Sequence, residues 1–123
     1  MLQNIGDRMN LISKPWGKEE ILEINDNYML KKITMWKDNR CSLQYHNYKK
    51  ETIYILIGKL RIYCGSKKDN LESRVFEPHE SITIPSKLIH RMEAIEDSVY
   101  LEASTPELND VVRLEDSYNR VST

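Results

Sequence analysis

The sequence lacks several features that would place it in a broad functional class. Its 18 basic and 19 acidic residues leave a formal net charge of −1, which gives no basic footprint for nucleic acid or for an anionic membrane. No apolar run approaches the roughly 20 residues that span a bilayer, and the first residues lack the basic and apolar regions of a secretory signal. The two cysteines, Cys41 and Cys64, have no metal-motif spacing, and thiols without a signal peptide suit a reducing compartment. These absences predict a cytoplasmic protein that binds neither nucleic acid nor membrane.

Length and residue patterning predict a single all-β domain. The 123 residues suit one domain with its own core, which we take as 1–123, with a body of about 14–120 and an N-terminal arm of 1–13. Apolar residues alternate, as in β-strands, in 28–36, 51–58, 59–64, 81–84 and 98–103. Turn-forming residues separate these runs, and Gly58 with Lys59 predicts a hairpin, while 106–114 favours at most one or two helical turns. Many short strands with regular turns indicate a β-sandwich or barrel.

Only three histidines occur, and two of them direct attention to a metal site. Imidazole nitrogen and carboxylate oxygen are common ligands of divalent ions. On a strand, Gln44 and His46 point to the same face, while Glu51 opens the next strand and His90 lies on a later one. These four side chains can therefore meet in one interior; the alternative is that both histidines are packed, hydrogen-bonded core residues. His79 lies in a Pro-His-Glu turn and is expected at the surface.

At these positions the sequence resembles the two motifs of the cupin superfamily. The first motif is matched by Gln44-x-His46-x4-Glu51-x6-Gly58. The second is matched by His79-x5-Pro85-x4-His90. The chain departs from the usual pattern by having Gln44 in place of a histidine, and His79 and Lys87 where glycines usually stand. The resemblance implies a cupin fold, a double-stranded β-helix or jelly-roll barrel.

The glutamine variant resembles one branch in particular, the type II mannose-6-phosphate isomerases. These often form the C-terminal domain of a bifunctional mannose-1-phosphate guanylyltransferase. Further matching segments are Lys14-Pro-Trp-Gly17, Ser42-Leu-Gln-Tyr-His46 and the segment 111–120. By this resemblance, one divalent ion, with Zn, Mn, Fe, Co and Ni not distinguishable, is held by Gln44, His46, Glu51 and His90.

The isomerase hypothesis assigns further roles. Such a reaction needs a base, a Lewis acid and a cation that holds the phosphate. We expect Glu102 to be the base and Arg113 to contact the phosphate, with Arg120 and Lys49 as further phosphate ligands, because arginine suits bidentate contact. Tyr48 flanks the first motif and is expected at the mouth of the cavity. Glu102 and Arg113 are thus the candidate catalytic residues, and the substrate-binding set is Arg113, Arg120, Lys49 and Tyr48.

Each of these roles has a structural alternative. The parity of Glu102 opposes that of its apolar neighbours, so it faces either a cavity or bulk water. Arg113 can instead pair with Glu115 or Asp116. The lysine pairs at 31–32, 49–50 and 67–68 are expected to be solvated unless Arg113 joins one of them around an anion.

Three functions stay open at the level of sequence, because fold alone does not determine function. The first is a metal-dependent aldose–ketose isomerase of a phosphorylated sugar, in nucleotide-sugar or polysaccharide synthesis. The second is a different cupin enzyme, such as an epimerase, lyase or oxygenase, and the third is a non-catalytic sugar-binding cupin. The expected partners are a phosphorylated sugar and a second copy of the chain in a homodimer, in which the N-terminal arm adds a strand to the neighbour's sheet.

Overall fold

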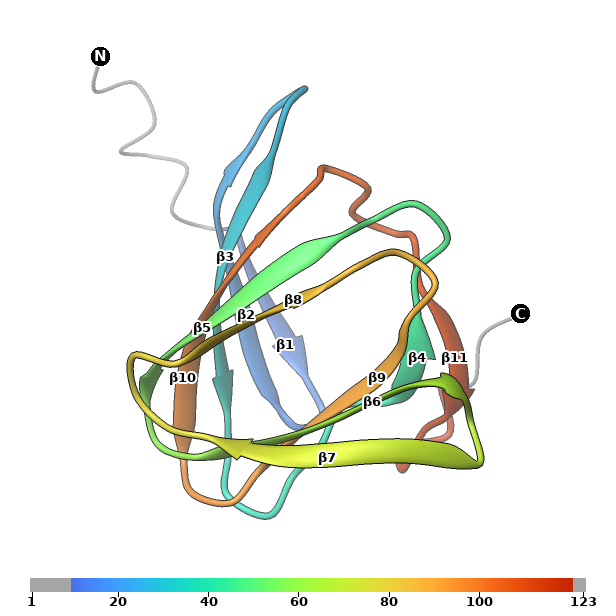
Figure 1. Cartoon of the computed structure of the whole chain (residues 1–123). Coiled ribbons are helices and arrows are strands. Elements are labelled where there is room, and N and C mark those ends of the chain that lie inside the picture. Colours follow the sequence, from blue (N-terminus) through green and yellow to red (C-terminus); the bar gives the residue numbers. More distant parts are fainter. Residues whose placement is uncertain (1–9, 121–123) are drawn as a thin grey trace.

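A computed structural model describes residues 10–120, which form eleven strands and no helix (Figure 1). The strands are β1 (Leu11–Lys14), β2 (Gly17–Ile24), β3 (Met29–Met35), β4 (Leu43–Tyr45), β5 (Glu51–Ile57), β6 (Leu60–Lys67), β7 (Asn70–Phe76), β8 (Ser81–Ile84), β9 (Ile89–Ala94), β10 (Ser98–Ser104) and β11 (Val112–Glu115). The all-β prediction is confirmed. The segment 106–114, which favoured at most one or two helical turns, contains none, because 106–111 is irregular and the chain then enters β11.

The strands form two antiparallel sheets. The six-stranded sheet has the order β1-β2-β3-β10-β5-β8, and the five-stranded sheet has the order β11-β4-β9-β6-β7. Strands that are distant in sequence are neighbours, so that β10 lies between β3 and β5 (Figure 1). This interleaving of strands is the double-stranded β-helix, or jelly roll, that the sequence motifs implied.

Gly58 joins the two sheets and does not form a hairpin. It connects β5 of the six-stranded sheet to β6 of the five-stranded sheet, and these strands are not paired with each other. The hairpin expected at Gly58 and Lys59 is therefore wrong. Its φ is 90°, and a Cβ there would lie 2.4 Å from the carbonyl oxygen of Asp97. A glycine is required at this corner because both the backbone conformation and the space exclude a side chain.

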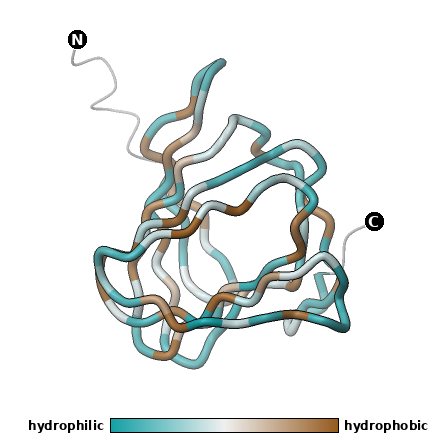
Figure 2. The backbone as a smooth tube through the Cα atoms, in the orientation of Figure 1, coloured by the Kyte–Doolittle hydropathy of each residue, from teal (hydrophilic) through white to brown (hydrophobic). Residues whose placement is uncertain are grey.

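The space between the sheets is filled by side chains that alternate inward along each strand. Buried apolar residues of this core include Trp16, Ile33, Met35, Ile53, Ile55, Leu60, Ile62, Phe76, Ile84, Met92 and Tyr100. Burial of such side chains is the main favourable contribution to folding, at roughly 25 cal/mol per Å² of apolar surface. Hydrophilic stretches lie at the tip of the β2–β3 hairpin and at the β6–β7 turn, away from this core (Figure 2).

The N-terminal arm is part of the chain's own sheet where it is described. Leu11–Lys14 form β1, the edge strand that pairs with β2, while residues 1–9 of the expected arm lie outside the described residues.

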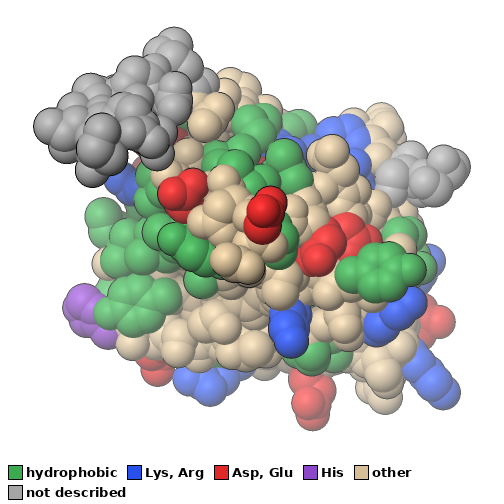
Figure 3. Space-filling view, turned by 90° about the horizontal axis from the view of Figure 1, so that it is seen from above, with side chains coloured by type: hydrophobic (Ala, Val, Ile, Leu, Met, Phe, Trp, Pro, Cys, Tyr) green, Lys and Arg blue, Asp and Glu red, His purple; other side chains and the backbone are tan. Residues whose placement is uncertain are grey.

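The end of the molecule seen from above exposes apolar side chains among charged ones (Figure 3). No helix in the described part of the chain is long and apolar enough to cross a membrane.

Candidate metal centre and its cavity

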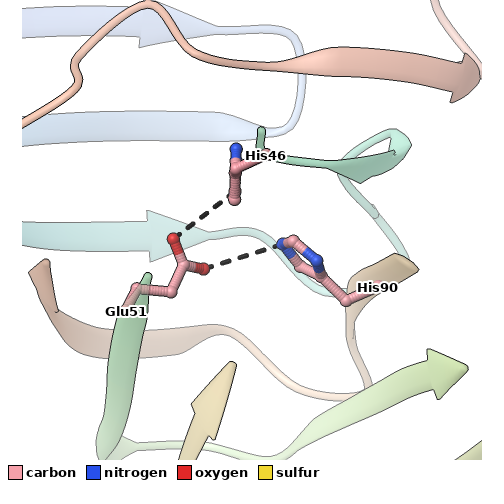
Figure 4. A group of neighbouring side chains, drawn as sticks. All are labelled: His46, Glu51 and His90. Atoms are coloured by element: carbon pink, nitrogen blue, oxygen red, sulfur yellow. Dashed lines mark ion pairs between the residues drawn. The ribbon is translucent and has the colours of Figure 1, made fainter. Parts of the chain in front are cut away.

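Three buried side chains meet between the sheets, with Glu51 directed toward both imidazoles (Figure 4). Glu51 opens β5, His90 lies on β9, and His46 follows the last residue of β4. The distance from His46 Nε2 to Glu51 Oε2 is 3.5 Å, and from His90 Nε2 to Glu51 Oε1 it is 3.7 Å. The ligand atoms of all three residues lie within 4.8 Å of one another. Both sheets therefore contribute to one compact donor set.

The second nitrogen of each ring fixes the tautomer. His46 Nδ1 lies 2.6 Å from the carbonyl oxygen of Asp110, and His90 Nδ1 lies 2.9 Å from that of Leu88. Because a carbonyl only accepts, each Nδ1 carries the proton and each Nε2 directs a lone pair toward Glu51. Neither Nε2 atom has a hydrogen-bond partner in the described structure, and Glu51 Oε2 has only the Lys49 ammonium, 3.2 Å away. Such converging acceptors fit a cation, and hydrogen-bonded outer nitrogens are typical of metal-binding histidines.

Burial sets the charge state of these residues. It lowers the pKa of His90 to about 4 and also lowers the pKa of His46, next to the Lys49 ammonium. Burial and the neighbouring Glu102 carboxylate raise the pKa of Glu51. Both imidazoles are thus neutral near pH 7, the form that binds metal, while Glu51 is in a site that favours added positive charge.

Gln44 lies in register with this centre. On the five-stranded sheet, Gln44 of β4 pairs with His90 on one side and with Arg113 of β11 on the other. Residues directly opposite on neighbouring strands share a face, and both Gln44 and Arg113 line the same cavity as the metal centre. Gln44 Oε1 accepts a hydrogen bond of 2.5 Å from Ser42. The structure thus brings all four sequence-predicted ligands to one region, with Gln44 beside the His–Glu–His group.

Lys49 and Glu102 form a buried ion pair next to Glu51. The ammonium lies 2.9 Å from Glu102 Oε2 and 3.2 Å from Glu51 Oε2. Glu102 is on β10, where it faces the interior together with Tyr100. The expectation that Lys49 is solvated is therefore wrong, and Glu102 faces the cavity and not bulk water. Burial raises the pKa of Glu102, but Lys49 and Lys31 lower it more, so that its carboxylate stays ionised.

The cavity also contains charged residues that sequence reasoning did not assign to the site. Lys31 of β3 pairs in register with Glu102, and its ammonium lies 3.0 Å from Glu19 on β2. Lys14 lines the same cavity. Lys31 was expected to be solvated, but it shares the parity of Met29 and Ile33, which are fully buried. That alternation was the signal that would have placed it inside.

The arginines reach the cavity from the C-terminal segment. Arg113 and Arg120 both line it. The guanidinium of Arg120 donates two hydrogen bonds to Asp116, of 2.9 and 3.1 Å, so Asp116 is the partner of Arg120. Burial lowers the pKa of Lys14, and the nearby charges of Lys31, Arg113 and Arg120 lower it further. Glu19 has the opposite effect but does not cancel them. Several positive charges therefore converge on a cavity of about 150 Å³.

Asp110 holds the loop that follows the first motif. Its carboxylate accepts hydrogen bonds from the backbone N–H groups of Asn47, Tyr48 and Lys49, while its carbonyl accepts from His46. Burial raises the pKa of Asp110, but these donors more than offset that effect and lower it to about 2. One residue thus fixes both a candidate ligand and the backbone of Lys49.

Tyr48 and His79 lie outside the cavity. Tyr48, expected at the cavity mouth, is 76% exposed and is not among the residues that line the cavity. His79 is exposed, as expected, and its Nδ1 lies 3.0 Å from the hydroxyl of Tyr54. Neither residue contacts the candidate metal centre.

Comparison with known proteins identifies the family that the sequence motifs resemble. Residues 4–116 match the family described as mannose-6-phosphate isomerase C-terminal. Mannose-1-phosphate guanylyltransferase ManC of Salmonella typhimurium is 29% identical over 120 residues, covering 89% of this chain and 23% of that protein. The alginate biosynthesis protein AlgA of Pseudomonas aeruginosa is 26% identical, covering 90% and 23%. The chain thus spans less than a quarter of the length of these curated relatives.

Solved structures share the fold. A Bacillus subtilis oxalate decarboxylase with Mn(II) centres superposes with a TM-score of 0.74 at 18% identity, over 86% of this chain and 30% of that one. At such low identity the likeness concerns the fold alone. Because the family match extends over nearly all of the sequence, the chain belongs to the mannose-6-phosphate isomerase C-terminal family of cupins.

Proposed function

We propose that this chain is a metal-dependent sugar-phosphate isomerase of the mannose-6-phosphate type, interconverting an aldose and a ketose phosphate. The observation that carries the proposal is the buried His46–Glu51–His90 group of converging acceptors, of which His46 and Glu51 line one cavity with an ionised carboxylate and several cations. A divalent ion bound there would act as a Lewis acid toward the oxygen atoms of the sugar. Gln44 completes the proposed set of ligands.

Glu102 is the proposed base. A carboxylate oxygen would remove the proton from the hydroxyl-bearing carbon next to the carbonyl and return it to the former carbonyl carbon. The hydroxyl proton passes to the former carbonyl oxygen, so that the product is an isomer of the substrate. This requires an ionised carboxylate near neutral pH, and Lys49 holds Glu102 in that form. The buried position on β10 keeps the carboxylate out of bulk water.

The phosphate is proposed to bind among Arg113, Arg120 and Lys14. All three line the cavity, and a dianionic group suits such a set of cations. Lys49, which the sequence suggested as a phosphate ligand, is instead committed to the two carboxylates. Remote binding of the phosphate would contribute to orientation of the reacting carbons.

The test is an isomerase assay with metal-loaded protein. We expect mannose 6-phosphate and fructose 6-phosphate to interconvert, and the activity to disappear in a His46→Asn/His90→Asn variant that remains folded. Binding of these sugars without turnover would support the non-catalytic alternative and contradict the proposal. Neither binding nor turnover, with metal present, would point to another substrate. The homodimer and the cytoplasmic location stay predictions from the sequence.

A further inference from the structure

Lys49 is a buried cation between a candidate metal ligand and a carboxylate that is not a member of the ligand set. Its ammonium contacts Oε2 of both Glu51 and Glu102, at 3.2 and 2.9 Å. The side chains of the three residues are only 7%, 2% and 6% exposed. Charges interact strongly in such a position because water does not screen them.

Pairing of two strands brings the two carboxylates close together. Glu51 and Glu102 lie on the neighbouring strands β5 and β10, with Glu102 opposite Ile53, and both face the interior. Lys49 approaches them from a loop that Asp110 fixes through three backbone N–H groups. Without the ammonium, two buried carboxylates would repel each other, and each would be an available ligand for a divalent ion.

We propose that Lys49 is a positioning residue that limits the metal affinity of the centre and keeps Glu102 from becoming a metal ligand. The inference rests on the metal centre of the proposed function, but not on isomerase activity. Two carboxylates and one ammonium give the cluster a net charge of −1, with both histidines neutral. Removal of the ammonium would leave −2 and free Glu102 Oε2, so a divalent ion would bind more tightly and gain a ligand.

Calorimetric titration with Co²⁺ tests this inference, with the visible spectrum of the ion as a second measurement. In Lys49→Met we expect the Kd for Co²⁺ to fall roughly tenfold or more, with a spectral change that reports an altered ligand set. In Glu102→Gln the Kd should rise, because the net charge of the cluster changes from −1 to 0, but the spectrum should stay that of the wild type, because Glu102 is not a ligand there. The double variant should bind more weakly than Lys49→Met and show the wild-type spectrum. Lys50→Met, which removes an exposed neighbouring charge, is the matched control and should bind as the wild type does.

An unchanged or weaker affinity in folded Lys49→Met would overturn the inference while leaving the metal centre in place. If Lys49→Met does not fold, the comparison moves to the Glu102→Gln background, where one carboxylate is already neutral. There, added Lys49→Met should still tighten Co²⁺ binding, and no change would overturn the inference. A wild-type chain that binds no Co²⁺ would overturn the metal centre, and both the proposed function and this inference with it.

Discussion

Lys87 occupies a left-handed backbone conformation that side chains disfavour. Its φ is 73°, and that of His79 is 75°; both stand where the cupin motif usually has glycine. A left-handed conformation costs a residue with a Cβ about 1 kcal/mol or more, yet the turn must be kept, because Lys87 N donates a 2.7 Å hydrogen bond to the carbonyl of His46. The chain therefore carries local strain directly beside a candidate metal ligand.

At position 87 a glycine should destabilise the protein less than an alanine does, whereas at most positions glycine is the more destabilising of the two. We expect Lys87→Gly to have a free energy of unfolding about 1 kcal/mol higher than Lys87→Ala, since only glycine adopts this φ without strain. Urea denaturation of both variants measures the difference. The exposed Lys50 has no positive φ, so the same pair of substitutions there should favour alanine. If the alanine variant is the more stable one at both positions, the backbone at Lys87 is not strained.

Glu102→Gln should remove activity without removing the metal. The glutamine keeps the shape of the side chain but cannot accept the substrate proton, so kcat should fall by a factor of roughly 10² to 10⁴. Progress curves with mannose 6-phosphate measure kcat, and Co²⁺ titration shows that the centre is intact. Glu96→Gln, which changes an exposed carboxylate, is the control and should leave kcat unchanged. An active Glu102→Gln variant would exclude Glu102 as the base.

At the scale of the element, the segment after β11 is fastened by side chains and not by strand pairing. Asp116 accepts hydrogen bonds from both the backbone and the guanidinium of Arg120, and Arg40 donates to Ser117. Burial raises the pKa of Asp116, but the hydrogen bonds from Arg120 more than offset it, so the pKa is lowered. These contacts hold Arg120 against the cavity.

Asp116→Asn should therefore destabilise the protein in a pH-dependent way. A carboxyl whose pKa is lowered on folding contributes stability that is present above its unfolded pKa of about 3.9 and is lost as the pH falls below it. We expect a loss of roughly 1–2 kcal/mol at pH 7, and a smaller difference between variant and wild type at pH 3. Urea denaturation at both pH values measures this, with the exposed Asp26→Asn as control. An equal difference at both values would rule out the ionised carboxylate as the cause.

Local patterns predicted the strands because period-two alternation is a property of short segments, but pairing between distant segments is not. Gly58 favours a hairpin by local pattern alone, since a tight turn and a corner between sheets use the same residue. On β10 the inward face carries Tyr100 and Glu102, while Leu101 faces outward, so hydrophobicity alone does not identify the interior face. The partner of Glu102 lies 53 residues away at Lys49, a separation that no local pattern reveals.

The candidate metal ligands were more predictable than the charges around them. A histidine and glutamine two positions apart must share a face, and the motif spacing placed Glu51 and His90 on other strands. The positions of Lys49 and Lys14 instead depend on which carboxylates the folded sheets bring near them. Burial of a lysine is favourable only with such a partner, and the partner is chosen by the tertiary fold.

At the scale of the whole molecule, the candidate metal centre joins the two sheets. Glu51 belongs to the six-stranded sheet, whereas Gln44 and His90 belong to the five-stranded sheet and His46 follows β4 of the same sheet. An ion bound to these residues would connect the sheets across the core. It would also occupy the converging lone pairs of His46 and His90, whose Nε2 atoms have no hydrogen-bond partner in the described structure.

Metal loading should consequently stabilise the entire fold and not just one loop. A ligand that binds only the folded chain adds about 2.7 kcal/mol at a free concentration of 100 times its Kd, which for a chain of this size raises Tm on the order of 10 °C. Differential scanning calorimetry with Co²⁺, then with excess EDTA, should show a single transition that rises and returns. In His46→Asn/His90→Asn the two conditions should give the same Tm, because the nitrogen donors are gone. A wild-type Tm that does not respond to Co²⁺, Zn²⁺ or Mn²⁺ would mean that the two imidazoles are core residues, and that the sheets are held together by packing alone.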